Sequence, residues 1–177
     1  MVHHTGEARQ TSAEVLPEPD KGRGVGTLER IWLKRGPGGP MDAVDSAVLE
    51  EHLGLRGNAN RGGRRQVTII SQARWAELMN ELRADLLPSA RRANLMVSGI
   101  DLEDSRGRVL RIGGARLKIN GETRPCEQME EAHAGLQALM RERWGGGAFA
   151  EVLDGGEIQV GDVVEWDTES KVGSERE

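Results

Sequence analysis

Cys126 is the only cysteine of the 177-residue chain, and it follows Arg124-Pro125 directly before a segment that favours a helix. A single cysteine excludes an internal disulfide and any zinc or iron–sulfur site that needs several thiolates. A thiol at the start of a helix lies near the positive end of the helix dipole, which favours the reactive thiolate. Three interpretations are open: a small buried hydrophobic residue, a nucleophile paired with histidine, or a sulfur carrier or single ligand of a soft metal.

The chemistry of the partner groups separates these interpretations. His133 lies seven residues after Cys126, which is about 10 Å along a helix at ~1.5 Å per residue and too far for a hydrogen bond. His52 would have to be brought in by the fold. One thiolate cannot hold zinc or iron alone, but it can complete the coordination of a metal whose other ligands come from a dithiolene.

Arginines gather in two segments that each lead into a predicted strand. Residues 54–65 (GLRGNANRGGRR) hold four glycines and four arginines, and Arg91-Arg92 precede Ala93-Asn94. Glycine lets backbone N–H groups approach an anion, and arginine binds an anion through paired hydrogen bonds. The segments are therefore either solvated loops or parts of an anion site at one mouth of a barrel. The net charge of −5 argues against nucleic acid as a partner.

The elements that would position these residues are mostly short strands separated by glycine-rich turns. Gly113-Gly114 is a two-residue hairpin signal, and Asn120-Gly121 predicts the next turn. Helices are predicted over 72–86, with Ser71 as N-cap, over 127–143, and over 44–52. Strands are predicted over 26–33, 67–70, 94–100, 108–112, 116–119, 149–153, 157–160 and 163–164. This pattern favours a mainly β fold, a closed or partly closed β-barrel with two or three peripheral helices.

The order of four segments resembles the MOSC domain, which is named after the C-terminal part of molybdenum cofactor sulfurase. The segments are GLRGNANRGGRRQVTII, RRANLMVSGIDL, RVLRIGGARLKINGETRPCEQM and GGGAFAEVLDGGEIQVGDVVEW. The resemblance covers about residues 25–166 and implies a stand-alone MOSC domain with a β-barrel core. We expect the domain to span 25–167, between disordered tails over 1–24 and 168–177.

The resemblance also implies roles for individual residues. Cys126 matches the family cysteine, which coordinates molybdenum or carries sulfur. Two groups of residues would face the pterin phosphate or form the wall of the pocket. They are Arg64, Arg65 and Gln66, which precede the buried strand, and Arg92 and Asn94 of an Arg-x-Asn-Leu element. One position departs from the family: Asn58 follows Gly57 where an aspartate is usual, which keeps hydrogen bonding but removes a charge.

The expected function is binding of the molybdenum cofactor (molybdopterin), with an arginine-rich pocket for the anionic pterin and the Cys126 thiolate as metal ligand or sulfur carrier. One alternative is a molybdenum-dependent reductase of N-hydroxylated compounds that needs a separate electron donor. If the protein is a sulfur carrier, the resemblance implies a sulfur-donor protein as its partner. The resemblance also suggests pyridoxal phosphate binding. The remaining alternative is a non-catalytic binding or adaptor barrel with a structural cysteine.

Localisation follows from what the chain lacks. The first residues carry no apolar core of the kind found in a secretory signal, and no window approaches the ~18 apolar residues of a membrane span. The sequence therefore predicts a cytoplasmic protein with no membrane partner.

Overall fold

The computed structural model describes residues 24–168. The predicted tails lie outside these residues, apart from Gly24 and Thr168. The strands are β1 (Val25–Lys34), β2 (Met41–Val44), β3 (Ser46–Glu50), β4 (Gly54–Leu55), β5 (Val67–Ser71), β6 (Leu95–Ser98), β7 (Val109–Ile112), β8 (Ala115–Glu122), β9 (Ala148–Asp154), β10 (Gly156–Gln159) and β11 (Val163–Trp166). The helices are α1 (Gln72–Leu82), α2 (Glu127–Ala132), α3 (Leu136–Met140) and the 3₁₀ helix η1 (Pro88–Arg91).

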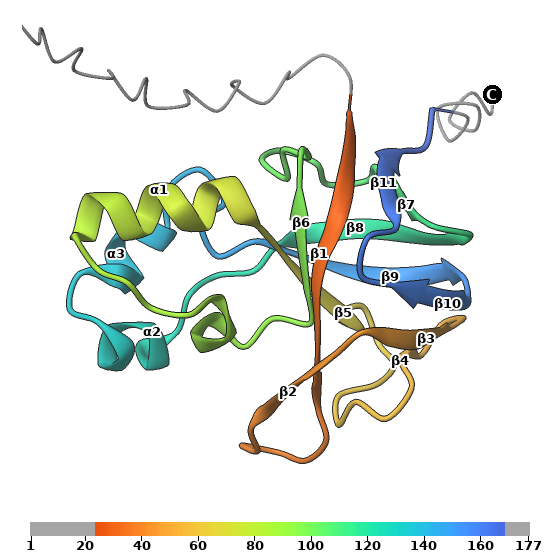
Figure 1. The fold of residues 1–177 in the computed structure, drawn as a ribbon, viewed down its shortest axis with the longest axis horizontal. Coiled ribbons are helices and arrows are strands. Elements are labelled where there is room, and N and C mark those ends of the chain that lie inside the picture. The colour runs from red at the N-terminus through yellow and green to blue at the C-terminus, as the bar shows by residue number, and fades with distance from the viewer. Residues whose placement is uncertain (1–23, 169–177) are drawn as a thin grey trace, which may run out of the picture.

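Seven strands form a closed barrel, which confirms the predicted fold class. They are hydrogen-bonded in the order β11-β7-β8-β9-β5-β6-β1, and β11 also pairs with β1 to close the barrel. β2 extends the sheet beyond β1, and β10, β3 and β4 form a second, three-stranded sheet. Figure 1 shows the helices gathered on one side of the barrel, away from the small sheet.

Alternating apolar residues of the barrel strands fill its interior. Leu28, Ile69, Leu95, Leu117 and Val152 are all fully buried in one continuous cluster. Burying a side chain of this size contributes about 1.5–3 kcal/mol relative to leaving it in water. A second cluster, built on Trp75, Leu78, Met129, Leu136 and Met140, packs α1 against α2 and α3. The helices therefore pack on one another through a core of their own, separate from that of the barrel.

α1 begins at the predicted cap and ends earlier than predicted. The Ser71 hydroxyl accepts a hydrogen bond of 3.3 Å from the Arg74 backbone N–H, as an N-cap does. The helix stops at Leu82 because Arg83 adopts the left-handed conformation, with φ of 51°. The apolar stripe continues to Leu86, which is why the sequence pattern overestimates the length.

The predicted helix over 127–143 is two short helices. His133 leaves the helical conformation with φ of −160°, and Gly135, with φ of 87°, turns the chain into α3. The Gly135 backbone N–H donates a 3.0 Å hydrogen bond to the Glu130 carboxylate, which fixes this break. Leu136 and Met140 still pack in the core shared with α1. The spacing of apolar residues therefore continues across the break, and the sequence pattern gives no sign of it.

Two other local predictions are wrong. The segment 44–52 is not a helix, because β3 pairs with β10 and β4 in the small sheet. Asn120-Gly121 is not a turn but part of β8, where the register with β9 shifts between Ile119 and Gly121. A Cβ at Gly121 would lie 3.0 Å from the Phe149 ring, so the glycine admits a packed aromatic ring. By contrast, Gly113-Gly114 links β7 to β8 as predicted.

Candidate functional site

Cys126 is exposed at the N-cap position of α2, where the chain leaves β8. Its Sγ lies 3.9 Å from Oε1 of Gln128, a long contact of its own segment. The interpretation of Cys126 as a small buried hydrophobic residue is therefore wrong. α2 has only six residues, so its dipole adds little to the surroundings of the thiol.

Neither histidine considered as a partner forms a hydrogen bond with Cys126 in residues 24–168. His133 caps the far end of α2, and its Nδ1 lies 2.9 Å from the Ala134 carbonyl oxygen. His52 contacts the Glu51 carboxylate at 3.3 Å, at the edge of the small sheet. A Cys–His hydrolase is not assembled here.

Arg91 supplies the strongest electrostatic feature near the thiol. It is 7% exposed, and its Nε donates a 3.0 Å hydrogen bond to the carbonyl oxygen of Gly146. No carboxylate of the described residues forms an ion pair with it. Burial and the nearby Arg65 charge lower the pKa of Arg91 to about 10, and Cys126 acts on it in the opposite direction. Arg65 and Cys126 therefore each lie within electrostatic reach of Arg91.

Backbone packed tightly around Arg91 completes this region. A Cβ at Gly146 would lie 2.0 Å from the Thr123 carbonyl oxygen and 3.4 Å from Nη2 of Arg91, so only glycine fits there. The Thr123 backbone N–H donates to the Gly147 carbonyl oxygen at 2.8 Å, while the Thr123 hydroxyl is buried without a hydrogen-bond partner. We call the group formed by Arg65, Arg91, Thr123, Cys126 and Gly146 the Cys126 site.

The amide side chains predicted from the resemblance are engaged in hydrogen bonds inside the protein. Asn94 Oδ1 accepts from the Thr68 backbone N–H at 3.1 Å, and its Nδ2 donates to Oδ1 of Asn58 at 3.2 Å. Asn58 Oδ1 also accepts from the Lys34 backbone N–H at 2.9 Å. Gln66 accepts from the Val152 backbone N–H at 2.9 Å. These residues join β1, β5, β6 and β9.

The departure at Asn58 has a structural consequence. Asn58 is 6% exposed, and its Oδ1 accepts from both the Lys34 backbone N–H and Nδ2 of Asn94. Its own Nδ2 donates to the Asn60 carbonyl oxygen at 3.2 Å. A carboxylate could accept but could not donate that bond. The neutral amide therefore suits this buried position.

The predicted arginines divide into two groups. Arg64 and Arg65 are exposed at the entry to β5, and the Arg64 backbone carbonyl accepts a 2.8 Å hydrogen bond from Asn120. Arg92 instead adopts a left-handed conformation, and its Nη2 donates to the Gly39 carbonyl oxygen at 2.6 Å, on the β1–β2 loop. Its neighbour Arg91 is the residue that faces the Cys126 site, and sequence reasoning did not single it out. The only signal was the doublet itself, preceded by Pro88.

Two cavities accompany these features. One of about 430 Å³ is lined by Glu122, Arg124, Pro125 and Arg141, and thus borders the segment that leads into the cysteine. A larger one of about 560 Å³ lies between α1 and β11, and none of its lining residues belongs to the Cys126 site. In residues 24–168, no three His, Cys, Asp or Glu side chains come together as a metal-binding group. Nor is any helix of this part long and apolar enough to cross a membrane.

Comparison with solved structures supports the fold independently. The chain is similar to the YuaD protein from Bacillus subtilis, at 22% identity and a TM-score of 0.69, over 81% of this chain and 96% of that one. It is also similar to YiiM from Escherichia coli, at 17% identity and a TM-score of 0.64, over 80% of this chain and 70% of that one. YiiM from Geobacillus stearothermophilus has 14% identity and a TM-score of 0.64, over 80% and 75% of the two chains.

The family assignment rests on the sequence. A comparison with curated proteins gives no match. Residues 47–165 match the MOSC domain family, which is associated with the molybdenum cofactor, and this match covers more than half of the chain and includes Cys126 and Arg91. The protein therefore belongs to the MOSC domain family.

Proposed function

We propose that this protein binds the molybdenum cofactor at the Cys126 site, with the Cys126 thiolate as metal ligand or sulfur carrier. The observation that carries the proposal is Arg91, a buried cation without a carboxylate partner, electrostatically coupled to a second arginine and to the thiol. A buried charge without a partner is costly in a stable fold. An anionic ligand compensates that cost.

The residues present fit such a cofactor in charge, in hydrogen bonding and in space. The pterin phosphate is an anion, and Arg91 and Arg65 offer charge-assisted donors to it. The Thr123 hydroxyl is a buried polar group that lacks a partner, as expected of a group whose partner is a ligand. Gly146 keeps the backbone close to Arg91 because no Cβ separates them.

Each residue has a distinct task in this proposal. Arg91, fixed by its hydrogen bond to the Gly146 carbonyl oxygen, holds the phosphate in a set position. Arg65 is exposed and adds attraction at the entrance. Cys126 presents its sulfur to the outside, where a metal held by a dithiolene or a sulfur-donor protein can reach it. When bound, the cofactor supplies a metal that can exchange electrons and carry oxygen or sulfur.

Whether the protein acts as a reductase or as a sulfur carrier depends on which molecule reaches the cavity next to the Cys126 segment. That cavity is lined by Arg124 and Arg141 together with Glu122, so a small polar substrate finds both donors and an acceptor there. Reduction of an N-hydroxylated base takes two electrons and two protons and releases the amine-type base and water. We propose that a separate protein supplies those electrons. As a sulfur carrier, the Cys126 thiolate would instead attack the outer sulfur of a persulfide on the sulfur-donor protein. The S–S bond of the donor breaks, the donor thiolate leaves, and Cys126 holds the sulfur as a persulfide for onward transfer.

The test is metal and pterin analysis of the full chain produced in cells that synthesise the cofactor. We expect molybdenum and pterin to copurify with the wild type. The Cys126→Ser variant should lose at least about 90% of the metal, since a neutral hydroxyl replaces a soft thiolate. The Arg91→Gln variant should lose metal and pterin together. Absence of molybdenum from the wild type, or full metal content in Cys126→Ser, would contradict the proposal.

A matched control and a trial substrate sharpen this test. Arg83→Gln removes the same charge from an exposed position at the end of α1, and should retain metal and pterin in full. Benzamidoxime with a chemical reductant then separates the two finer activities. Turnover by the loaded wild type favours the reductase, whereas a persulfide on Cys126, detected by mass spectrometry without turnover, favours the sulfur carrier.

A further inference from the structure

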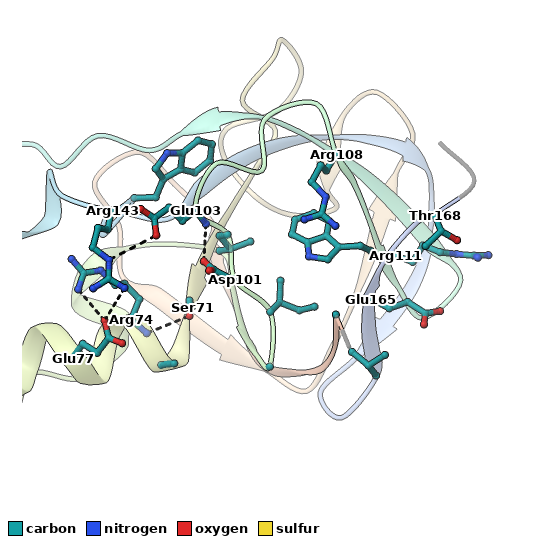
Figure 2. Close-up of a pocket in the computed structure, with 18 residues that line it drawn as sticks. Ser71, Arg74, Glu77, Asp101, Glu103, Arg108, Arg111, Arg143, Glu165 and Thr168 are labelled. Carbon is teal, nitrogen blue, oxygen red and sulfur yellow. Dashed lines mark hydrogen bonds and ion pairs between the residues drawn. The ribbon is translucent and has the colours of Figure 1, made fainter. Parts of the chain in front are cut away.

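The larger cavity, which we call the Trp166 pocket, is a second region with the dimensions of a ligand site. Its volume of about 560 Å³ lies within the ~300–1,000 Å³ typical of small-molecule sites. Its walls come from the start of α1, the segment after β6, the strands β7 and β11, and the segment before β9. Figure 2 shows that its charged side chains gather at two ends.

At the α1 end, the charges are paired with one another. Arg74 Nη1 lies 3.1 Å from the Glu77 carboxylate, and Arg143 lies 3.9 Å from Glu77 and 3.7 Å from Glu103. Arg74 also donates to the Glu142 carbonyl oxygen at 3.1 Å. Two cations and two anions therefore balance here, and Figure 2 shows them as one connected group. This end offers little net charge to a ligand.

At the opposite end, the two lining arginines, Arg108 and Arg111, form no ion pair within residues 24–168. The guanidinium carbon of Arg108 lies 4.1 Å from the centre of the Trp166 ring, in a cation–π contact. No carboxylate of residues 24–168 forms an ion pair with Arg108. Glu165, the nearest acidic residue along β11, is instead the cross-strand neighbour of Arg111. The stacking holds the guanidinium plane and leaves its N–H groups free to donate.

Between the two ends the wall is apolar and aromatic. Trp144 and Trp166 are half-buried, and Val25, Ile100 and Leu102 lie along the same pocket. The acidic side chain on this wall, Asp101, already accepts a 3.0 Å hydrogen bond from the Glu103 backbone N–H. An apolar ring gains by leaving water against such a wall, and flat rings pack well on indole.

We propose that the Trp166 pocket binds a planar aromatic carboxylate, with its carboxylate on Arg108 and its ring on the apolar wall. The positive charge of Arg108 favours a negatively charged ligand, and the aromatic lining favours a flat one. At the α1 end a cationic ligand is disfavoured, because the acidic groups there are occupied by arginines. At the other end, Glu165 stands beside Arg108 and Arg111, so a cationic probe is one arm of the test. This site shares no residue with the Cys126 site, so the proposal stands whether or not the cofactor binds.

The test uses the full chain without cofactor and three probes of one shape and different charge: 2-naphthoate, 2-naphthamide and 2-naphthylmethylammonium. Isothermal titration calorimetry should give a sub-millimolar dissociation constant for naphthoate. The amide should bind about tenfold more weakly and the cation more weakly still. Equal affinity for naphthoate and naphthamide, or no naphthoate binding at millimolar concentration, overturns the proposal.

Variants locate the binding. Arg108→Gln should weaken naphthoate about tenfold and leave naphthamide unchanged, because only the anion uses the charge. Arg83→Gln, exposed and outside the pocket, should leave both probes unchanged. Because Arg108 is an exposed side chain, its replacement should not affect folding, which circular dichroism checks. Unchanged naphthoate binding in Arg108→Gln places the ligand elsewhere and contradicts the proposal.

Discussion

Arg91 at the Cys126 site is buried without a carboxylate, whereas Arg74 and Arg143 in the Trp166 pocket share the Glu77 carboxylate between them. Arginine is thus without a carboxylate partner in one region of the described domain and ion-paired in the other. Paired arginines contribute to the fold and have little charge left for a ligand. A buried arginine left unpaired costs stability, and the structure retains it beside the family cysteine. Local pairing, more than the number of arginines, distinguishes a binding arginine from a structural one.

The segment 143–147 joins the two regions, and it offers the largest predicted effect. Gly146→Ala places a Cβ 2.0 Å from the Thr123 carbonyl oxygen, a backbone atom that cannot move aside cheaply. We expect a loss of about 3 kcal/mol in the free energy of unfolding, or roughly 6–12 °C in Tm. Thermal unfolding followed by circular dichroism measures it.

Gly114→Ala is the matched control, because nothing lies within 4 Å of a Cβ built there. It should change Tm by no more than about 1 °C. If Gly146→Ala behaved like this control, the tight packing behind Arg91 would not be required, and the contrast between the two regions would lose its structural basis.

The second prediction concerns the cost of the unpaired charge. Arg91→Met replaces a buried cation by an apolar side chain of similar length, at the loss of one hydrogen bond to Gly146. We expect the cofactor-free protein to gain about 1 kcal/mol of stability, since the charge has no ion-pair partner to lose. Urea unfolding at pH 7 checks this.

The pH dependence of the same variant is a further check. Burial lowers the pKa of Arg91 from its ordinary value to about 10, so between these two values the unfolded chain binds more protons than the folded one. The destabilisation is therefore complete below the folded pKa and is relieved as the pH rises above it. The advantage of Arg91→Met should stay constant up to about pH 9 and shrink as the pH rises through about 10 and above. A constant difference across that range would count against an unpaired charge.

The smallest effect is expected at the paired arginines. Glu77→Gln breaks contacts with Arg74 and Arg143, but the Glu77 side chain is 49% exposed, so we expect a loss of about 0.5 kcal/mol that fades at high salt. Glu81→Gln on the same helix is the control and should be neutral, because Glu81 forms no ion pair within the part of the chain that the structure describes. A loss above about 2 kcal/mol at Glu77 would show that the pairing carries much more of the fold than its exposure implies.

Much of the barrel follows from the sequence because its strands are short runs of β-branched and apolar residues, as in Val67–Ser71. The errors have a common cause in contacts between distant segments. Residues 44–52 become strands only because β10 pairs with β3, and Gly121 stays in a strand because Phe149 packs against it. No local pattern contains that information.

The candidate site was partly predictable for the same reason. A cysteine ahead of a predicted helix and two arginine segments are visible in the sequence. The structure brings Arg65 and Cys126 each within electrostatic reach of Arg91. Which arginine of the Arg91-Arg92 doublet faces the thiol is not visible. It depends on the left-handed conformation of Arg92, which sends that side chain to the Gly39 carbonyl oxygen instead.

The pairing of β1 with β11 has a consequence for how the domain is made. Because Val25 is the register partner of Glu165, the barrel cannot close until nearly all of the domain has been synthesised. Until then, β1 and β7 each expose an unpaired edge, and such edges promote association between incomplete chains. The domain therefore passes through ribosome-bound stages in which an open sheet must be shielded, and its closing strand is the last part of the barrel to emerge.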